Sequence, residues 1–151
     1  MTNGHNKVFL DSNILISLKF TNHPHAQKAN LIIKKIIKQN KKIFISPLVL
    51  DEFIHSIKFL LQQQKISIEK IHKILQKITK EILYIPNLKI VNPPTSKTQN
   101  LKILNYIKKF KLSPRDAYHL LTITHNNIKY FATFDNDFKR VFSSSLLKPT
   151  T

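Results

Sequence analysis

The sequence predicts an α/β fold, a three-layer α/β/α sandwich in which helices cover both faces of a central parallel sheet. The alternation of two kinds of segment leads to this class. Short apolar runs alternate along the chain with longer segments whose apolar residues recur at helical spacing. Such alternation is typical of parallel strands joined by helical crossovers. Because the 151 residues contain one glycine and no low-complexity stretch, we expect a single domain over residues 1–151.

Four strands are expected, each a short apolar run with a turn or helix-start residue after it. They cover residues 7–10, 42–45, 88–91 and 130–134. The first strand ends directly before Asp11 and the last directly before Asp135. The sequence Asn-Pro-Pro at 92–94 closes the third strand as a loop.

Helices are expected between these strands. Two Ser-Pro pairs, Ser46-Pro47 and Ser113-Pro114, indicate helix starts, because serine can cap free backbone amides and proline tolerates the first helical position. Elsewhere the apolar residues form one stripe and the lysines face outward. The expected helices cover residues 12–20, 25–39, 47–63, 67–83, 98–109, 114–125 and, as a short piece, 138–142.

The charge of the chain points to a polyanionic partner. There are 25 Lys and Arg against 8 Asp and Glu, which gives a formal charge of +17. RNA, DNA or an acidic protein would each be attracted by such a field. The alternative is a lysine-rich proteome, which raises charge without any ligand. We favour nucleic acid.

Several classes of protein are excluded or disfavoured. Without cysteine there is no disulfide scaffold, thiolate zinc site or cysteine nucleophile. With Gly4 as the only glycine, a glycine-rich phosphate loop is impossible. The seven histidines lack zinc-site spacing on one helix, and no serine occupies a recognisable nucleophile turn. The N-terminus has no apolar leader and no segment is apolar for about 18 residues, so we expect a cytoplasmic protein with no membrane span.

The positions of the few acidic residues suggest a site. In open α/β sheets, ligands bind beyond the carboxyl ends of the strands, where Asp11 and Asp135 are expected. An aspartate in a strand-to-helix turn can also simply cap the helix. The full set of acids is Asp11, Asp51, Glu52, Glu69, Glu81, Asp116, Asp135 and Asp137.

Helical geometry separates the neighbours Asp51 and Glu52. Asp51 falls nearly opposite the apolar face of its expected helix and is interpreted as a solvated surface charge. Glu52 lies at the flank of that face, where its carboxylate can turn into a cleft. We therefore choose Glu52 as the candidate site residue. The apolar face consists of Val49, Phe53, Ile57, Leu60 and Leu61.

Asp116 and Asp137 each have two interpretations. Asp116 follows Ser113 by three residues, a spacing that resembles a capping box, and a helix N-terminus favours negative charge. It also shares a stripe with Leu120 and Ile123, so it should face the core side, and both roles can hold together. Asp137 is either a peripheral ligand or the start of the short helix after it.

Converging carboxylates without thiolates or imidazoles prefer hard cations, here Mg²⁺ or Mn²⁺. Such a site can ionise water and stabilise a leaving oxygen at a phosphate. Acids surrounded by lysines are therefore what an RNA or DNA hydrolase needs, and helix capping alone does not predict this combination.

Four motifs, in order along nearly the whole chain, resemble those of the PIN-domain nuclease family, which includes the VapC-type toxins. They are VFLDSNILI, SPLVLDEF, LSPRDAYHLL and FATFDNDF. The resemblance implies a PIN-like fold whose acids meet at the carboxyl edge of the sheet and hydrolyse single-stranded RNA with metal-activated water. The matched residues are Asp11, Glu52, Asp116 and Asp135 as catalytic acids and metal ligands, Asp137 as a further metal ligand, and Asn13 and Thr133 as supporting polar groups.

Arg115 maps onto no role in this family; it either contacts phosphate or lies in solvent. The resemblance also implies homodimerisation and, if the chain is a toxin, an antitoxin protein as a partner. A housekeeping RNA-processing enzyme is the other form of the nuclease hypothesis. The competing class is a catalytically inactive RNA-binding or assembly module on the same fold. A phosphatase-like interpretation of Asp11-Ser12-Asn13 is weaker, because Asn13 breaks the DxD pattern.

Overall fold

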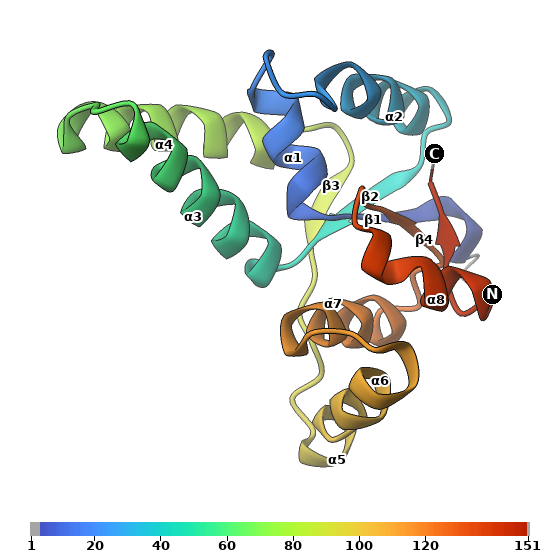
Figure 1. Cartoon of the computed structure of the whole chain (residues 1–151). Helices are drawn as coiled ribbons and strands as arrows, with labels where there is room; N and C mark the ends of the chain where they lie inside the picture. The colour runs from blue at the N-terminus through green and yellow to red at the C-terminus, as the bar shows by residue number, and fades with distance from the viewer. Residues whose placement is uncertain (1–3, 151) are drawn as a thin grey trace.

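The computed structural model describes residues 4–150 and contains a parallel sheet between two sets of helices (Figure 1). The sheet has five strands in the order β3-β2-β1-β4-β5, and every neighbouring pair is parallel. This confirms the predicted fold class. The predicted domain also includes residues 1–3 and 151, which lie outside the described range. The strands are β1 (Lys7–Leu10), β2 (Lys42–Ile45), β3 (Leu88–Ile90), β4 (Tyr130–Ala132) and β5 (Lys148–Pro149).

Helices α1 to α4 lie on one side of the sheet and α5 to α7 on the other (Figure 1). The direction of the crossovers explains this division. The chain moves from β1 outward to β2 and β3, then returns past β1 to β4, and right-handed crossovers in opposite directions place helices on opposite faces. The helices are α1 (Ser12–Lys19), α2 (Ala26–Lys38), α3 (Pro47–Gln63), α4 (Ile68–Leu83), α5 (Lys97–Asn100), α6 (Lys102–Phe110), α7 (Pro114–His125) and α8 (Lys139–Ser143), with 3₁₀ turns η1 (Gly4–Asn6) and η2 (Asn136–Phe138).

The reversal of chain direction positions the site. Strands β2 and β4 lie on either side of β1, and the connections that leave β1 and β4 diverge to opposite faces. Open α/β sheets bind ligands at such a reversal point, beyond the carboxyl ends of the strands. Asp11 and Asp135 follow β1 and β4, so both lie at this edge of the sheet.

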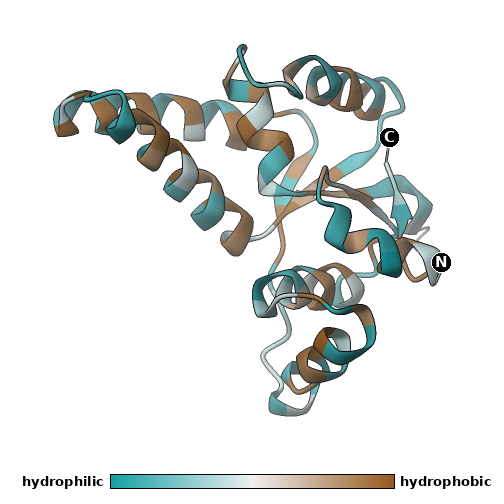
Figure 2. Cartoon of the chain, viewed as in Figure 1, coloured by the Kyte–Doolittle hydropathy of each residue, from teal (hydrophilic) through white to brown (hydrophobic). Residues whose placement is uncertain are grey.

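The core fills both sides of the sheet. Val8, Phe9 and Leu10 of β1 are fully buried, as expected for a central strand covered on both faces. Along the helices, hydrophobic and hydrophilic residues alternate, in keeping with one buried face on each (Figure 2). Helices α3 and α7 begin at the predicted serines: Ser46 Oγ accepts from Val49 N and Ser113 Oγ from Asp116 N.

The last predicted strand is shorter than expected, and the structure gives the reason. It ends at Ala132 rather than at residue 134. The backbone N–H of Phe134 donates to Asn13 Oδ1 at 3.2 Å, and that of Asp135 donates to Thr133 Oγ1 at 3.0 Å. These side chains accept the hydrogen bonds that the backbone of a neighbouring strand would otherwise accept. Strand β4 therefore ends early.

Three further differences are local. Strand β5 was not predicted, because its two residues include a proline and show no alternation; Lys148 N donates to Lys129 O at 2.9 Å. The predicted helix 98–109 is divided into α5 and α6 at Leu101. The short C-terminal helix is a 3₁₀ turn followed by α8. Within residues 4–150, none of the helices is both long and apolar enough to cross a bilayer.

Candidate metal and nuclease site

Asp11 is the most tightly held of the candidate acids. Its backbone N–H donates to Ala132 O at 3.0 Å, which extends the pairing of β1 with β4 by one residue. Its carboxylate accepts hydrogen bonds from Ser12 N at 2.7 Å, Thr133 Oγ1 at 2.6 Å and Asn13 Nδ2 at 3.1 Å. The structure therefore places the two predicted supporting residues, Asn13 and Thr133, directly on the first candidate acid.

Burial raises the pKa of the Asp11 carboxyl, because only 7% of the residue is exposed. The nearby His119 and the hydrogen bond from Thr133 act in the opposite direction, and the charge of Glu52 adds to the rise. A nearby cation would offset the cost of ionising this buried group. The local environment is thus suited to a bound positive charge.

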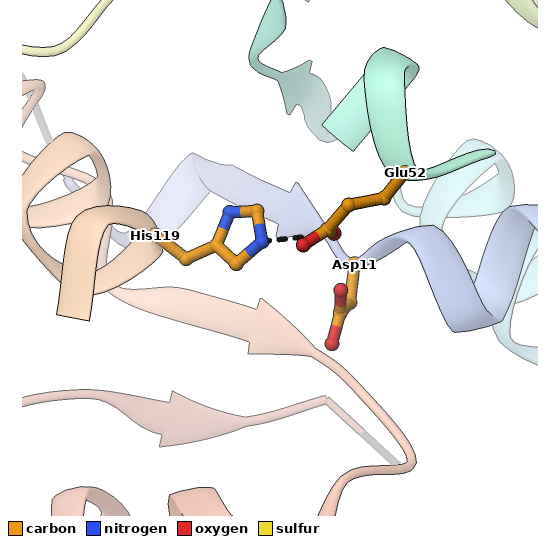
Figure 3. A group of neighbouring side chains, drawn as sticks. All are labelled: Asp11, Glu52 and His119. Atoms are coloured by element: carbon orange, nitrogen blue, oxygen red, sulfur yellow. Dashed lines mark hydrogen bonds and ion pairs between the residues drawn. The ribbon is translucent and has the colours of Figure 1, made fainter. Parts of the chain in front are cut away.

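Glu52 projects from the flank of α3 toward Asp11, as helical geometry predicted (Figure 3). Its Oε2 lies 3.0 Å from His119 Nε2, and its Oε1 lies 3.4 Å from Arg115 Nε. Burial raises the pKa of Glu52, but the hydrogen bond and charge of His119, together with Ser12 and Arg115, outweigh it and the net pKa is lowered. Its neighbour Asp51 is exposed, as expected.

His119 is the site residue that the sequence analysis did not identify. It is 1% exposed, and its ring lies between α7 and Glu52 (Figure 3). Burial lowers its pKa, but Glu52, Asp11 and Asp116 outweigh this and raise it overall. A usable signal was present: His119 follows Asp116 by three residues, so both lie on one face of the same helix.

Asp116, Asp135 and Asp137 form a second acidic group. One carboxylate oxygen from each lies within 4.8 Å of the others. Asp116 also serves the capping role considered from the sequence: its N–H donates to Ser113 Oγ, and Ser113 Oγ donates to Asp116 Oδ2 at 2.8 Å. Asp135 Oδ1 accepts from the N–H of Asp137 at 2.8 Å, which fixes the turn between them.

Burial and the neighbouring charges of Asp135 and Asp137 raise the pKa of Asp116, against the opposing effects of the Ser113 hydrogen bond and His119. Neighbouring carboxylates repel one another when all are ionised. A divalent cation between them would relieve that repulsion. The donor set, oxygen atoms from three carboxylates, fits Mg²⁺ or Mn²⁺.

The predicted cluster of four acids is therefore two adjacent groups. The first contains Asp11, Glu52 and His119, each offering a ligand atom within 4.8 Å of the others, and the second contains the three aspartates. His119 lies close enough to Asp116 for each to shift the pKa of the other, so the groups are in electrostatic contact. Asp116 comes from the opposite side of the sheet to Glu52, and only the fold brings them together.

Arg115 pairs with Glu52 through one nitrogen, and 60% of its side chain is exposed. Its guanidinium is thus anchored beside the acids while most of it faces solvent. Both roles considered for Arg115, a contact with phosphate and a position in solvent, are compatible with this placement, and the phosphate contact stays a hypothesis.

The fold and the site together define an α/β protein with carboxylates gathered at the carboxyl edge of a parallel sheet. The PIN domain family model matches residues 8–142. The chain belongs to the PIN-domain family, as its four motifs predicted.

Two curated proteins and two solved structures are similar to this chain. Ribonuclease VapC2 of Methanocaldococcus jannaschii is 33% identical over 140 residues, which cover 90% of this chain and 89% of that protein. Ribonuclease VapC6 of the same organism is 22% identical over 151 residues, covering 93% and 96%. Among solved structures, VapBC2 from Rickettsia felis, bound to a DNA fragment from its promoter, aligns with a TM-score of 0.62 at 17% identity, covering 96% of this chain and 99% of that chain. VapBC-1 from nontypeable Haemophilus influenzae aligns with a TM-score of 0.60 at 19% identity, covering 95% and 96%. These two likenesses support the fold.

Proposed function

We propose that the protein is a metal-dependent endoribonuclease that hydrolyses phosphodiester bonds of single-stranded RNA. One observation carries this proposal: two adjacent carboxylate groups lie at the carboxyl edge of the sheet in a chain of charge +17. The positive charge would attract the RNA backbone, and the acids would hold the cations that the reaction needs. The names of the two ribonuclease relatives support the same activity.

Mg²⁺ or Mn²⁺ is the proposed cofactor, held by Asp116, Asp135 and Asp137 and by the group around Asp11 and Glu52. When bound, such a cation lowers the pKa of water and neutralises charge that develops on phosphate oxygens. The four catalytic acids proposed are Asp11, Glu52, Asp116 and Asp135. Asp137 completes the metal site.

The remaining residues have proposed roles in holding these acids. Thr133 and Asn13 keep the Asp11 carboxylate in one orientation by donating hydrogen bonds to it. His119 and Arg115 hold both oxygens of Glu52. Fixing the acids before substrate arrives lowers the cost of organising the site during the reaction.

Basic side chains beside the second acidic group would bind the RNA backbone. A pocket of about 310 Å³ is lined by Asp137 together with Lys111, Lys139 and Arg140. Phosphates of RNA that pass over the aspartates would meet these cations next. Such contacts position the strand without reading its sequence.

Cleavage of a labelled single-stranded RNA tests the proposal. Activity should require Mg²⁺ or Mn²⁺ and disappear with a chelator. Asp116→Asn keeps a hydrogen-bond acceptor at the helix cap but removes a charge from the site, and we expect it to lower kcat/KM by about 100-fold or more. Asp11→Asn should behave alike.

Glu69→Gln is the matched control, because it removes one charge from an exposed position on α4. It should cleave as the wild type does. Cleavage by Asp116→Asn and Asp11→Asn at the wild-type rate would remove the proposed site. RNA binding without cleavage by the wild type would favour the alternative, a catalytically inactive RNA-binding or assembly module.

We further propose that the chain is the toxin of a toxin–antitoxin pair, acts in the cytoplasm and forms a homodimer. The two VapBC structures that share its fold motivate the first point. A pocket of about 520 Å³ between α3 and α4, lined by Ile54, Leu75, Leu83 and Tyr84, is an apolar surface of the kind that partner proteins cover. Co-purification with a small acidic protein encoded next to this one, and the mass of the complex, test both partners.

A further inference from the structure

A further pocket lies at the carboxyl edge of the sheet, beside the start of α3. Its volume is about 450 Å³, and its walls are mainly apolar. Pro47 and Leu48 come from the start of α3, Pro93 from the loop after β3, and Tyr118 from α7. Asp51 is the acidic residue among those that line the pocket. The proposed reaction gives this pocket no role.

Its place in the fold connects it to the acids. Leu48 lies one helical turn before Glu52, and Tyr118 is the residue before His119. The pocket therefore lies at the carboxyl ends of β2 and β3. Asp11 and the three aspartates lie along the same edge of the sheet, beside β1 and β4. Neighbouring strands are about 4.8 Å apart, so a strand of RNA whose phosphate lies on the acids has its next bases within reach of this pocket.

The pocket has the chemistry of a nucleobase site. Tyr118 lines the pocket and is 39% exposed, so it is the aromatic residue that could stack on a base. Aromatic side chains stack on unpaired RNA bases, and polar groups then read the base edge. Pro47, Pro93 and Leu48 supply apolar walls. Sequence-specific recognition of single-stranded RNA commonly uses this combination.

The kind of nucleobase that would fit this pocket can be inferred from Asp51. Its carboxylate has no hydrogen-bond or ion-pair partner within residues 4–150. An ionised carboxylate only accepts hydrogen bonds. Guanine offers two adjacent N–H donors on its Watson–Crick edge, N1–H and the N2 amino group, which one carboxylate can accept together. Uracil offers a single N–H between two carbonyl oxygens, and these would repel the carboxylate.

We propose that this pocket binds an unstacked guanine next to the scissile phosphate and so gives the nuclease a nucleotide preference. The inference rests on the proposed function, since the same RNA strand must cross both sites. A bare carboxylate beside an RNA path repels phosphate, and this cost is offset when the carboxylate accepts hydrogen bonds from a base.

Cleavage of a randomised single-stranded RNA library, with the cut sites sequenced, tests the proposal. The wild type and Glu69→Gln should both enrich guanine at one fixed position relative to the cut, by about tenfold over uracil, as expected of a good bidentate contact. Asp51→Asn replaces one acceptor with a donor, so guanine enrichment should fall and the other bases should rise. An unchanged profile for Asp51→Asn overturns the proposal.

Stacking is tested separately. Tyr118→Ala should lower kcat/KM for a guanine-containing substrate by about tenfold, whereas Tyr118→Phe keeps the ring and should stay near the wild type. Equal loss in both variants, or loss in neither, contradicts a stacking role.

Binding of short labelled oligonucleotides without added metal separates this inference from the proposed function. Guanine-selective binding that depends on Asp51, in the absence of any cleavage when metal is then supplied, supports the pocket and refutes the nuclease. Cleavage without nucleotide preference refutes the pocket alone. Neither binding nor cleavage of any RNA refutes both.

Discussion

At the scale of single residues, Asp11 shows how a buried carboxylate can be kept available to a cation. Burial raises its pKa and favours the protonated form. The hydroxyl of Thr133, the amide of Asn13 and the backbone N–H of Ser12 all donate to it, and donated hydrogen bonds favour the ionised form. Of these, the Thr133 hydrogen bond is the shortest at 2.6 Å. The residue that supports Asp11 lies 122 positions away in sequence.

Thr133→Val removes this hydroxyl while preserving the shape of the side chain. Without that donor the pKa of Asp11 should rise further, and Mn²⁺ should bind about 10- to 100-fold more weakly, the range for groups that orient a metal ligand. Calorimetric titration with Mn²⁺ at pH 7 measures the change. Thr133→Ser keeps the hydroxyl and should retain most of the affinity. Equal Mn²⁺ affinity in the valine variant would refute the supporting role.

At the scale of elements, helices α3 and α7 approach the site from opposite sides of the sheet and are joined through Glu52. His119 and Arg115, both on α7, contact its two oxygens. His119 is buried on all sides, so its interaction with Glu52 is shielded from solvent. This interaction holds the first acidic group in position and should also contribute to the stability of the metal-free protein.

The contribution of His119 to the stability of the folded protein should decrease as pH rises. Its pKa is raised in the folded state above the reference value of 6.5. The folded protein therefore binds the proton more tightly than the unfolded chain, so the stabilisation is fully present below pH 6.5 and is lost as pH rises through the raised pKa. His119→Gln should cost more stability at pH 6 than at pH 9, by about 1 kcal/mol.

Urea denaturation in the presence of a chelator, at both pH values, measures this difference. The control is His72→Gln, a substitution of an exposed histidine on α4. It should change the free energy of unfolding little at either pH. A loss of stability in His119→Gln that is the same at pH 6 and pH 9 would contradict a protonated His119 beside Glu52.

At the scale of the whole molecule, the chain carries a formal net charge of +17, whereas its candidate site is built from acids. The two signs of charge have separate proposed tasks: the acids hold cations, and the basic surface attracts the polyanion. Binding of RNA should therefore weaken steeply with salt, because each phosphate that the protein neutralises releases bound counterions. Basic residues close to the acids should account for a larger share of this dependence than distant ones.

Replacing Lys139 and Arg140 together by glutamine tests this expectation. Both line the pocket beside Asp137. The slope of log affinity against log salt concentration should become shallower by about 1.4, or about 0.7 for each phosphate of single-stranded RNA that the variant no longer neutralises. The matched double variant at Lys70 and Lys73, exposed positions on α4, removes the same charge far from the site. Equal changes of slope would mean that RNA binds without a preferred path.

Much of the fold could be predicted because its signals are local. Apolar runs indicated β1, β2 and β3, and the serines at 46 and 113 indicated the starts of α3 and α7 at the observed residues. Helical geometry distinguished the inward Glu52 from the exposed Asp51. Strand β5 and the early end of β4 could not be predicted, because both depend on hydrogen bonds from remote parts of the chain: Lys148 to Lys129, and Phe134 to Asn13.

The sequence by itself determined the residue types, the alternation of strands and helices, and the positions of Asp11 and Asp135 after two strands. The tertiary structure decided which acids share a group, that His119 belongs to the group of Asp11 and Glu52, and that Asp51 borders a pocket. The physical reason is range. Helix caps and buried strands are set by neighbours within a few residues, whereas a carboxylate site depends on distances across the sheet edge that only the assembled fold fixes.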